Sequence, residues 1–131
     1  RQVRIVPVPL SLGYDEKAAD QLGAFGKALA AVPGEFLVVA STDLNHYEDQ
    51  KTTVEKDEAV VRAIEALDEA GLVQAIRTRE ISMCGFAPTI AAIAYARAKG
   101  ATKGKTVAHA TSGDVSGDYD RVVGYVGMVI S

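Results

Sequence analysis

Apolar residues recur along the first part of the chain with the spacing of a strand, a helix and a second strand. Residues 3–8 form a short β-rich run, which predicts a strand. A stretch with apolar positions on one helical face predicts a helix over 16–31, and Asp15 suits its N-cap. Residues 36–40 are continuously apolar and too few for a helix, so they predict a strand buried on both faces.

The second part of the chain alternates helices with loops and then closes with two strands. Thr52 or Thr53 suits the N-cap of a helix, and a short helix is expected over 72–78. A third helix over 89–99 is rich in Ala, Ile and Tyr, so we expect it to be buried. Strands are expected over 106–110 and 121–130.

This order of elements predicts one α/β domain over residues 1–131. Strands separated by helices favour a three-layer α/β/α sandwich, and the closing hairpin makes its sheet mixed. The chain begins at Arg1 with a segment that already reads as a strand. This start looks like a cut through a larger protein, so we expect the domain to be completed by another segment of the protein or by another chain.

Composition narrows the classes of protein that remain. With 48% hydrophobic and 24% charged residues, the 131-residue chain should fold around one core. The net charge of -3 argues against a nucleic-acid binder, and no run approaches the ~18 apolar residues of a membrane span. A single cysteine, Cys84, excludes an internal disulfide and favours a reducing compartment, so we expect a cytoplasmic protein.

The loop that follows the apolar run at 36–40 carries the first candidate chemistry. Asp43 and His46 lie three residues apart, and ligands of open α/β sheets bind where strands end. Such a pair can hold an imidazole in one tautomer, as a base or a metal ligand requires. The alternative is a turn in which Asp43 caps local N–H groups and His46 is exposed.

Cys84 lies just before a predicted helix, whose positive end favours a thiolate. A thiolate can act as a nucleophile or as a soft metal ligand, whereas the alternative is a small buried apolar residue.

The loop at 111–118 is rich in Gly, Ser and Asp and lacks the Gly-Lys-Ser/Thr ending of a P-loop. Asp114 could position a substrate there, while Asp118 is expected to fix the loop by accepting N–H bonds. His109 precedes this loop inside a strand, where a core or supporting role is favoured over catalysis.

Three motifs in a fixed order resemble the C-terminal half of Memo-family proteins, also described as AmmeMemoRadiSam system protein B. They are Ser-Thr-Asp-Leu-Asn-His-Tyr at 41–47, Cys-Gly-Phe-Ala-Pro at 84–88, and Thr-Ser-Gly-Asp-Val-Ser-Gly-Asp at 111–118 with Val-Val-Gly-Tyr-Val-Gly at 122–127. The resemblance implies the fold of class III extradiol dioxygenases, which are non-haem iron enzymes, and a radical-SAM system partner.

The resemblance also implies a metal-site-like cleft. Cys84 matches the family cysteine, His46 the histidine and Asp43 the aspartate. Two further family histidines lie in the N-terminal half and have no counterpart here, because His109 falls in a different motif. A thiolate ligand is softer than the two-histidine, one-carboxylate set of extradiol enzymes and favours copper(I) or a different state of iron.

Three functions follow as hypotheses. The first is a mononuclear iron or copper redox cleft, in which Cys84 and His46 bind metal, His46 and Asp43 serve catalysis, and Asp114 and Tyr47 contact substrate. The second is a non-catalytic module that binds a peptide or small molecule in the same cleft. The third is a thiol hydrolase with Cys84, His46 and Asp43 as its triad.

Overall fold

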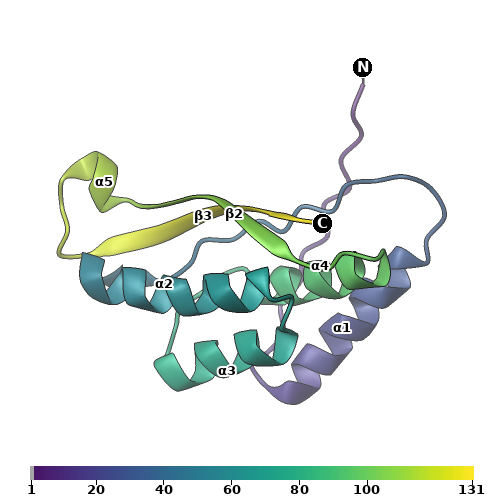
Figure 1. The fold of residues 1–131 in the computed structure, drawn as a ribbon, viewed down its shortest axis with the longest axis horizontal. Coiled ribbons are helices and arrows are strands. Elements are labelled where there is room, and N and C mark those ends of the chain that lie inside the picture. The colour runs from purple at the N-terminus through teal and green to yellow at the C-terminus, as the bar shows by residue number, and fades with distance from the viewer. Residues whose placement is uncertain (1) are drawn as a thin grey trace.

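The computed structural model describes residues 2–131 and confirms the predicted α/β class (Figure 1). The elements are α1 (Glu16–Ala30), β1 (His46–Glu48), α2 (Gln50–Glu65), α3 (Glu69–Arg79), α4 (Phe86–Ala98), β2 (Gly104–Thr111), α5 (Gly113–Ser116) and β3 (Val122–Ile130).

The sheet has three strands in the order β1-β3-β2, and both pairings are antiparallel. The long β2–β3 hairpin sets Gly104 opposite Ile130, and the short strand β1 pairs its His46 with Val123. In Figure 1, α2 runs along one side of this hairpin, and α3 lies on the far side of α2 from the sheet. The C-terminal strand thus joins the loop that carries His46 to the body of the protein.

Two predicted strands, 3–8 and 36–40, are wrong: neither segment is paired as a strand among the described residues. Ile5 is 85% exposed and Leu37 86% exposed, so the expected burial of 36–40 on both faces is also wrong. The reason is physical, because β-rich composition only suits a strand, whereas a strand exists when a neighbour accepts and donates its backbone hydrogen bonds. Both segments therefore run as irregular, apolar chain.

The helices begin where side chains can accept their free N–H groups. Asp15 caps α1 as predicted, with Ala18 donating to its carboxylate at 2.7 Å. The prediction for α2 was wrong by one turn, because Asp49 rather than Thr52 or Thr53 is the N-cap. An aspartate accepts strongly from N–H groups in the first helical turn, so the earlier capping site prevails.

The core lies between the helices and the inner face of the sheet. Its fully buried side chains include Leu44, Val60, Leu72, Ile90 and Ile93, each removing enough apolar surface from water to contribute about 1.5–3 kcal/mol. The predicted burial of the Ala- and Ile-rich helix, α4, is confirmed. Helices α1 and α4 approach closely, since a Cβ on Gly26 would come within 2.8 Å of the Ala94 Cβ.

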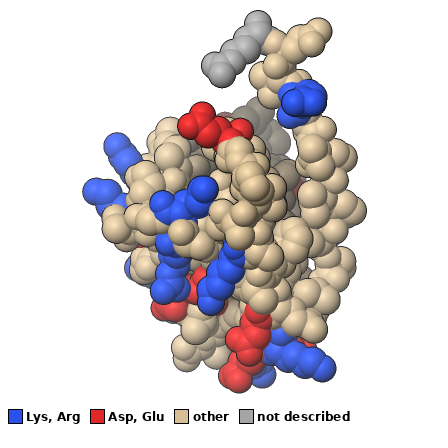
Figure 2. Space-filling view, turned by 90° about the vertical axis from the view of Figure 1, so that its right-hand side faces the viewer, with Lys and Arg blue, Asp and Glu red and all other residues tan. Residues whose placement is uncertain are grey.

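Figure 2 shows basic side chains gathered in the left and middle part of one face, with acidic side chains above and below them and the two kinds in contact near the lower end. The projecting N-terminal segment adds little charge, because Arg4 is the only charged residue in 2–12. Among residues 2–131, no helix combines the length and apolar character needed to cross a membrane.

Candidate metal centre

Two loops meet beside the start of α4, and a glycine permits their approach. Gly85 donates its N–H to the Thr42 Oγ1 at 2.8 Å, which ties the loop after residue 40 to the loop after α3. A Cβ on Gly85 would collide with the Thr42 side chain and lie 2.6 Å from the carbonyl oxygen of Ser41. The Cys-Gly sequence thus brings the cysteine next to the aspartate loop.

The meeting of these loops gathers Asp43, His46 and Cys84. One ligand atom from each side chain lies within 4.8 Å of the other two, and Asp43 Oδ2 is 3.8 Å from His46 Nε2. The imidazole is mostly buried, with 16% of its side chain exposed, while the Asp43 side chain is 47% exposed. The group is therefore accessible to solvent on one side and anchored on the other.

Cys84 is exposed, so the alternative of a buried apolar cysteine does not hold. Its Sγ accepts the backbone N–H of Asp43 at 3.1 Å. The residue immediately precedes Gly85, the N-cap of α4, as the sequence predicted. The sulfur is thus held by a hydrogen bond while remaining open to a ligand.

The tautomer of His46 follows from its hydrogen-bond partner. Its Nδ1 lies 2.6 Å from the carbonyl oxygen of Ser82, and a carbonyl can only accept a hydrogen bond. The Nδ1 therefore carries the proton, which leaves the lone pair of a neutral ring on Nε2, the nitrogen that faces Asp43. A histidine that ligates a metal is commonly fixed in this way, with its other ring nitrogen donating to a carbonyl or carboxylate.

The three donors suit a transition-metal ion. Metal–ligand bonds of about 2.0–2.3 Å in tetrahedral geometry separate ligand atoms by roughly 3.3–3.8 Å. The 3.8 Å between Asp43 Oδ2 and His46 Nε2 is longer than the roughly 3.3–3.5 Å of an oxygen–nitrogen pair at such a site, so the two side chains would move slightly closer together around an ion. A carboxylate, an imidazole and a thiolate together match iron, copper or zinc rather than calcium or magnesium, which prefer oxygen alone.

Of the two predicted substrate contacts, Tyr47 lies beside the three-residue group, with its ring centroid 5.5 Å from that of His46. Asp114 has no contact with the group among the described residues. Asp114 Oδ2 accepts the backbone N–H of Thr111 at 2.8 Å and so fixes its own loop. Tyr47 is 65% exposed, adopts a left-handed backbone with φ 64°, and carries the Arg121 guanidinium 5.7 Å from its ring centroid.

Sequence reasoning missed Ser82, which contacts His46 through both its backbone and its hydroxyl. No motif marked this serine, because it lies between two apolar residues in an undistinguished loop. His109 supports another side chain, as expected, because its Nε2 lies 2.9 Å from Asp57 Oδ2.

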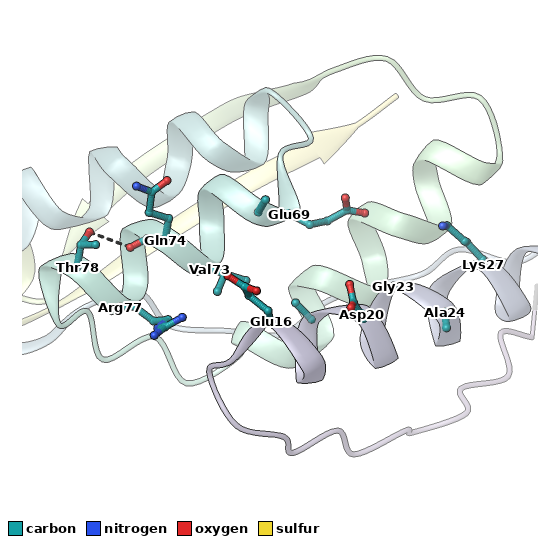
Figure 3. A pocket seen from close by; sticks show the side chains of 12 residues that line it. Glu16, Asp20, Gly23, Ala24, Lys27, Glu69, Val73, Gln74, Arg77 and Thr78 are labelled. Atoms are coloured by element: carbon teal, nitrogen blue, oxygen red, sulfur yellow. Dashed lines mark hydrogen bonds between the residues drawn. The ribbon is translucent and has the colours of Figure 1, made fainter.

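Two grooves lie on the surface, and only one of them reaches the three-residue group. One, of about 1160 Å³, runs between the N-terminal segment and residues 35–41 and ends at Cys84, Gly85 and Pro88. The other, of about 990 Å³, lies between α1 and α3 and shares no residue with the candidate centre. Figure 3 shows its acidic Glu16 and Asp20 on α1.

The chain is similar in sequence to known proteins. Residues 1–129 match the Memo-like protein family. A MEMO1 family protein of Methanopyrus kandleri is 42% identical over 130 residues, covering 96% of this chain and 44% of the relative. MEMO1 family proteins of Thermotoga maritima and Methanocaldococcus jannaschii are 41% and 38% identical over 98% and 97% of this chain.

The chain spans 44–45% of the length of these three relatives. The match of the family over nearly all of residues 1–131 agrees with the resemblance carried by the three loop motifs. The ranges matched in these relatives cover 96–98% of this chain. The chain belongs to the Memo-like protein family.

Proposed function

We propose that Asp43, His46 and Cys84 bind one transition-metal ion, iron or copper, in a redox cleft related to that of non-haem iron dioxygenases. The observation that carries this proposal is the placement of one ligand atom from each side chain within 4.8 Å of the others. Three protein ligands with open positions are typical of catalytic metal sites.

Each side chain has a separate task in this proposal. His46 presents the lone pair of Nε2, because its Nδ1 proton is held by the Ser82 carbonyl. Cys84 supplies a soft sulfur, and the exposed carboxylate of Asp43 serves as ligand or as proton acceptor for a bound substrate. A bound iron or copper ion would supply one-electron redox chemistry, which no side chain of this group provides.

The same geometry disfavours the thiol-hydrolase hypothesis. In a triad the carboxylate orients the imidazole through one ring nitrogen while the other nitrogen faces the nucleophile. Here the Ser82 carbonyl occupies Nδ1, and Asp43 lies on the Nε2 side of the ring. Asp43 therefore cannot orient His46 from the far side, whereas three donors around one point suit a metal.

Anaerobic titration with Fe(II), with Cu(I) and with Co(II) as a spectroscopic probe tests the proposal. The chain should bind one ion with a sulfur-to-metal charge-transfer band, and Cys84→Ser should remove the band and weaken binding at least about tenfold. Asp43→Asn should weaken binding, whereas Asp20→Asn, an exposed aspartate on α1, should not. Reducing conditions are needed because air oxidises exposed thiolates.

If neither Cys84→Ser nor Asp43→Asn weakens metal binding, the metal does not bind in this cleft. That result would favour the second hypothesis, a non-catalytic module that binds a peptide or small molecule. One observation already supports it. The apolar groove that ends at Cys84 is lined by strand-like segments that have no strand partner among the described residues, with Val3 81% and Val39 75% exposed.

We propose that an extended polypeptide, from the N-terminal half that the family resemblance implies or from another chain, covers these segments, because unpaired β-rich chain accepts an added strand. Such a cover could also bring the two histidines that this chain lacks. Binding would protect the backbone amides of 3–8 and 36–40 from hydrogen exchange. Hydrogen-exchange protection found only in other parts of the chain would contradict the proposal that these segments are covered.

A further inference from the structure

Asp57 is a buried carboxylate that the proposed metal centre does not use. It lies on α2 with 0% of its side chain exposed, whereas its neighbour Glu58 is 59% exposed. The sheet makes room for it, because a Cβ on Gly124 of β3 would collide with the Asp57 carboxylate. A fully buried acidic side chain is costly unless each oxygen is paired, so its partners show what it holds.

Both oxygens of Asp57 are paired. Oδ1 accepts the backbone N–H of Asn45 at 3.0 Å, and Oδ2 lies 2.9 Å from His109 Nε2. His109 reaches this carboxylate from β2 and keeps 25% of its side chain exposed. The pair therefore connects the middle of α2 and the hairpin to the loop that carries the candidate ligands.

Asn45 directly precedes the candidate ligand His46 in that loop, and it is also fully buried. Its carbonyl accepts the N–H of Gly124 at 2.9 Å. Its side-chain Oδ1 accepts from Ser82 twice, from the backbone N–H at 3.2 Å and from the hydroxyl at 3.3 Å. Asn45 thus fixes where Ser82 lies.

Ser82 in turn fixes His46. The His46 N–H donates to Ser82 Oγ at 2.9 Å, and the imidazole Nδ1 lies 2.6 Å from the Ser82 carbonyl. A continuous chain of hydrogen bonds therefore runs from His109 through Asp57, Asn45 and Ser82 to the imidazole. Every link joins residues that lie at least 12 positions apart in the sequence.

We propose that Asp57, held by His109, is a positioning residue that keeps His46 in its Nδ1-protonated tautomer with Nε2 directed at the candidate centre. The expected effect on metal affinity rests on the proposed function, whereas the expected tautomer of His46 does not. The buried carboxylate holds the Asn45 backbone, and Asn45 holds the serine whose carbonyl selects the tautomer. Loss of either end of the Asp57 pairing should release the ring.

The test compares His109→Leu, His109→Gln and Asp57→Ala with the original chain, and Glu58→Gln serves as the matched control. The first readout is the ¹⁵N NMR spectrum of the imidazole in metal-free protein. The chain has two histidines, so His109 variants show His46 alone. The second readout is Co(II) affinity, and amide spectra establish that each variant is folded.

The original chain and Glu58→Gln should show His46 as one Nδ1-protonated tautomer. His109→Leu should give a mixture of tautomers and weaken Co(II) binding about tenfold or more, as loss of outer partners of metal ligands does. His109→Gln should restore the single tautomer, because its amide can still donate to Asp57. Asp57→Ala should resemble His109→Leu or be more severe.

An unchanged His46 spectrum in folded His109→Leu would overturn the positioning role, whatever the metal result. The absence of Co(II) binding by the original chain would instead count against the proposed function, while the tautomer readout would still decide this inference. If Asp57→Ala does not fold, the comparison of His109→Leu with His109→Gln decides the question.

Discussion

Gly85→Ala should separate the two loops that form the candidate centre. The backbone of Gly85, with φ -97° and ψ 31°, is open to any residue, so the reason for glycine is space. An added Cβ would lie 2.5 Å from Thr42 Oγ1 and 2.6 Å from the Ser41 carbonyl oxygen. The neighbours include rigid backbone, so the loops must move apart.

The magnitude follows from three contributions. Forcing one carbon into a packed site costs about 1–3 kcal/mol, and weakening the hydrogen bond from Gly85 to Thr42 costs about 1 kcal/mol. Replacing glycine restricts the unfolded chain and returns about 0.4–1 kcal/mol. The free energy of unfolding should therefore fall by about 2 kcal/mol.

Urea unfolding followed by circular dichroism measures this change. With a slope of about 1.5 kcal/mol/M, the midpoint should fall by roughly 1 M. Gly23→Ala is the matched control, because a Cβ there has no neighbour within 4 Å and lies inside α1, where alanine should raise stability by about 0.5–1 kcal/mol. A Gly85→Ala midpoint equal to that of the original chain would refute the steric argument. The same variant should also weaken Co(II) binding, since Cys84 moves with Gly85.

Three further outcomes are expected. Asp114→Ala should lower stability by about 1 kcal/mol in urea unfolding, because the Thr111 N–H loses its acceptor, and should leave Co(II) affinity unchanged. Burial raises the pKa of Asp57, although the hydrogen bonds from Asn45 and His109 partly oppose this shift. At pH values above the unfolded-state pKa of about 3.9 the folded state therefore holds a proton that the unfolded state has lost, so stability should fall as pH rises through the raised pKa. Asp57→Asn should abolish that fall in urea midpoints measured against pH. The hydrogen bond from Lys56 lowers the pKa of Glu48 in the folded state. This interaction stabilises the fold at pH values above the unfolded-state pKa of Glu48, and the stabilisation is lost as pH falls through the folded-state pKa. Lys56→Met should raise the Glu48 pKa toward its ordinary value in a carboxyl NMR titration.

The helices and the identities of the candidate ligands could be predicted from the sequence. Asp15 marked the start of α1, and the apolar composition of 89–99 marked α4 as buried, because helical hydrogen bonds and caps lie within a few residues of one another. The loop positions of Asp43, His46 and Cys84 followed from the same local signals and from the family motifs. The family motifs also implied that these three side chains share one cleft, and the fold confirms that they converge, with one ligand atom of each within 4.8 Å of the others.

The tertiary structure decided whatever depended on residues distant in sequence. Segments 3–8 and 36–40 have the composition of strands, yet pairing needs a neighbour that composition does not supply. The tautomer of His46 depends on the carbonyl of Ser82, 36 residues away, which no local pattern marks. The closeness of the loops depends on the missing Cβ of Gly85, since contact across 43 residues is a matter of packing rather than of local conformational preference.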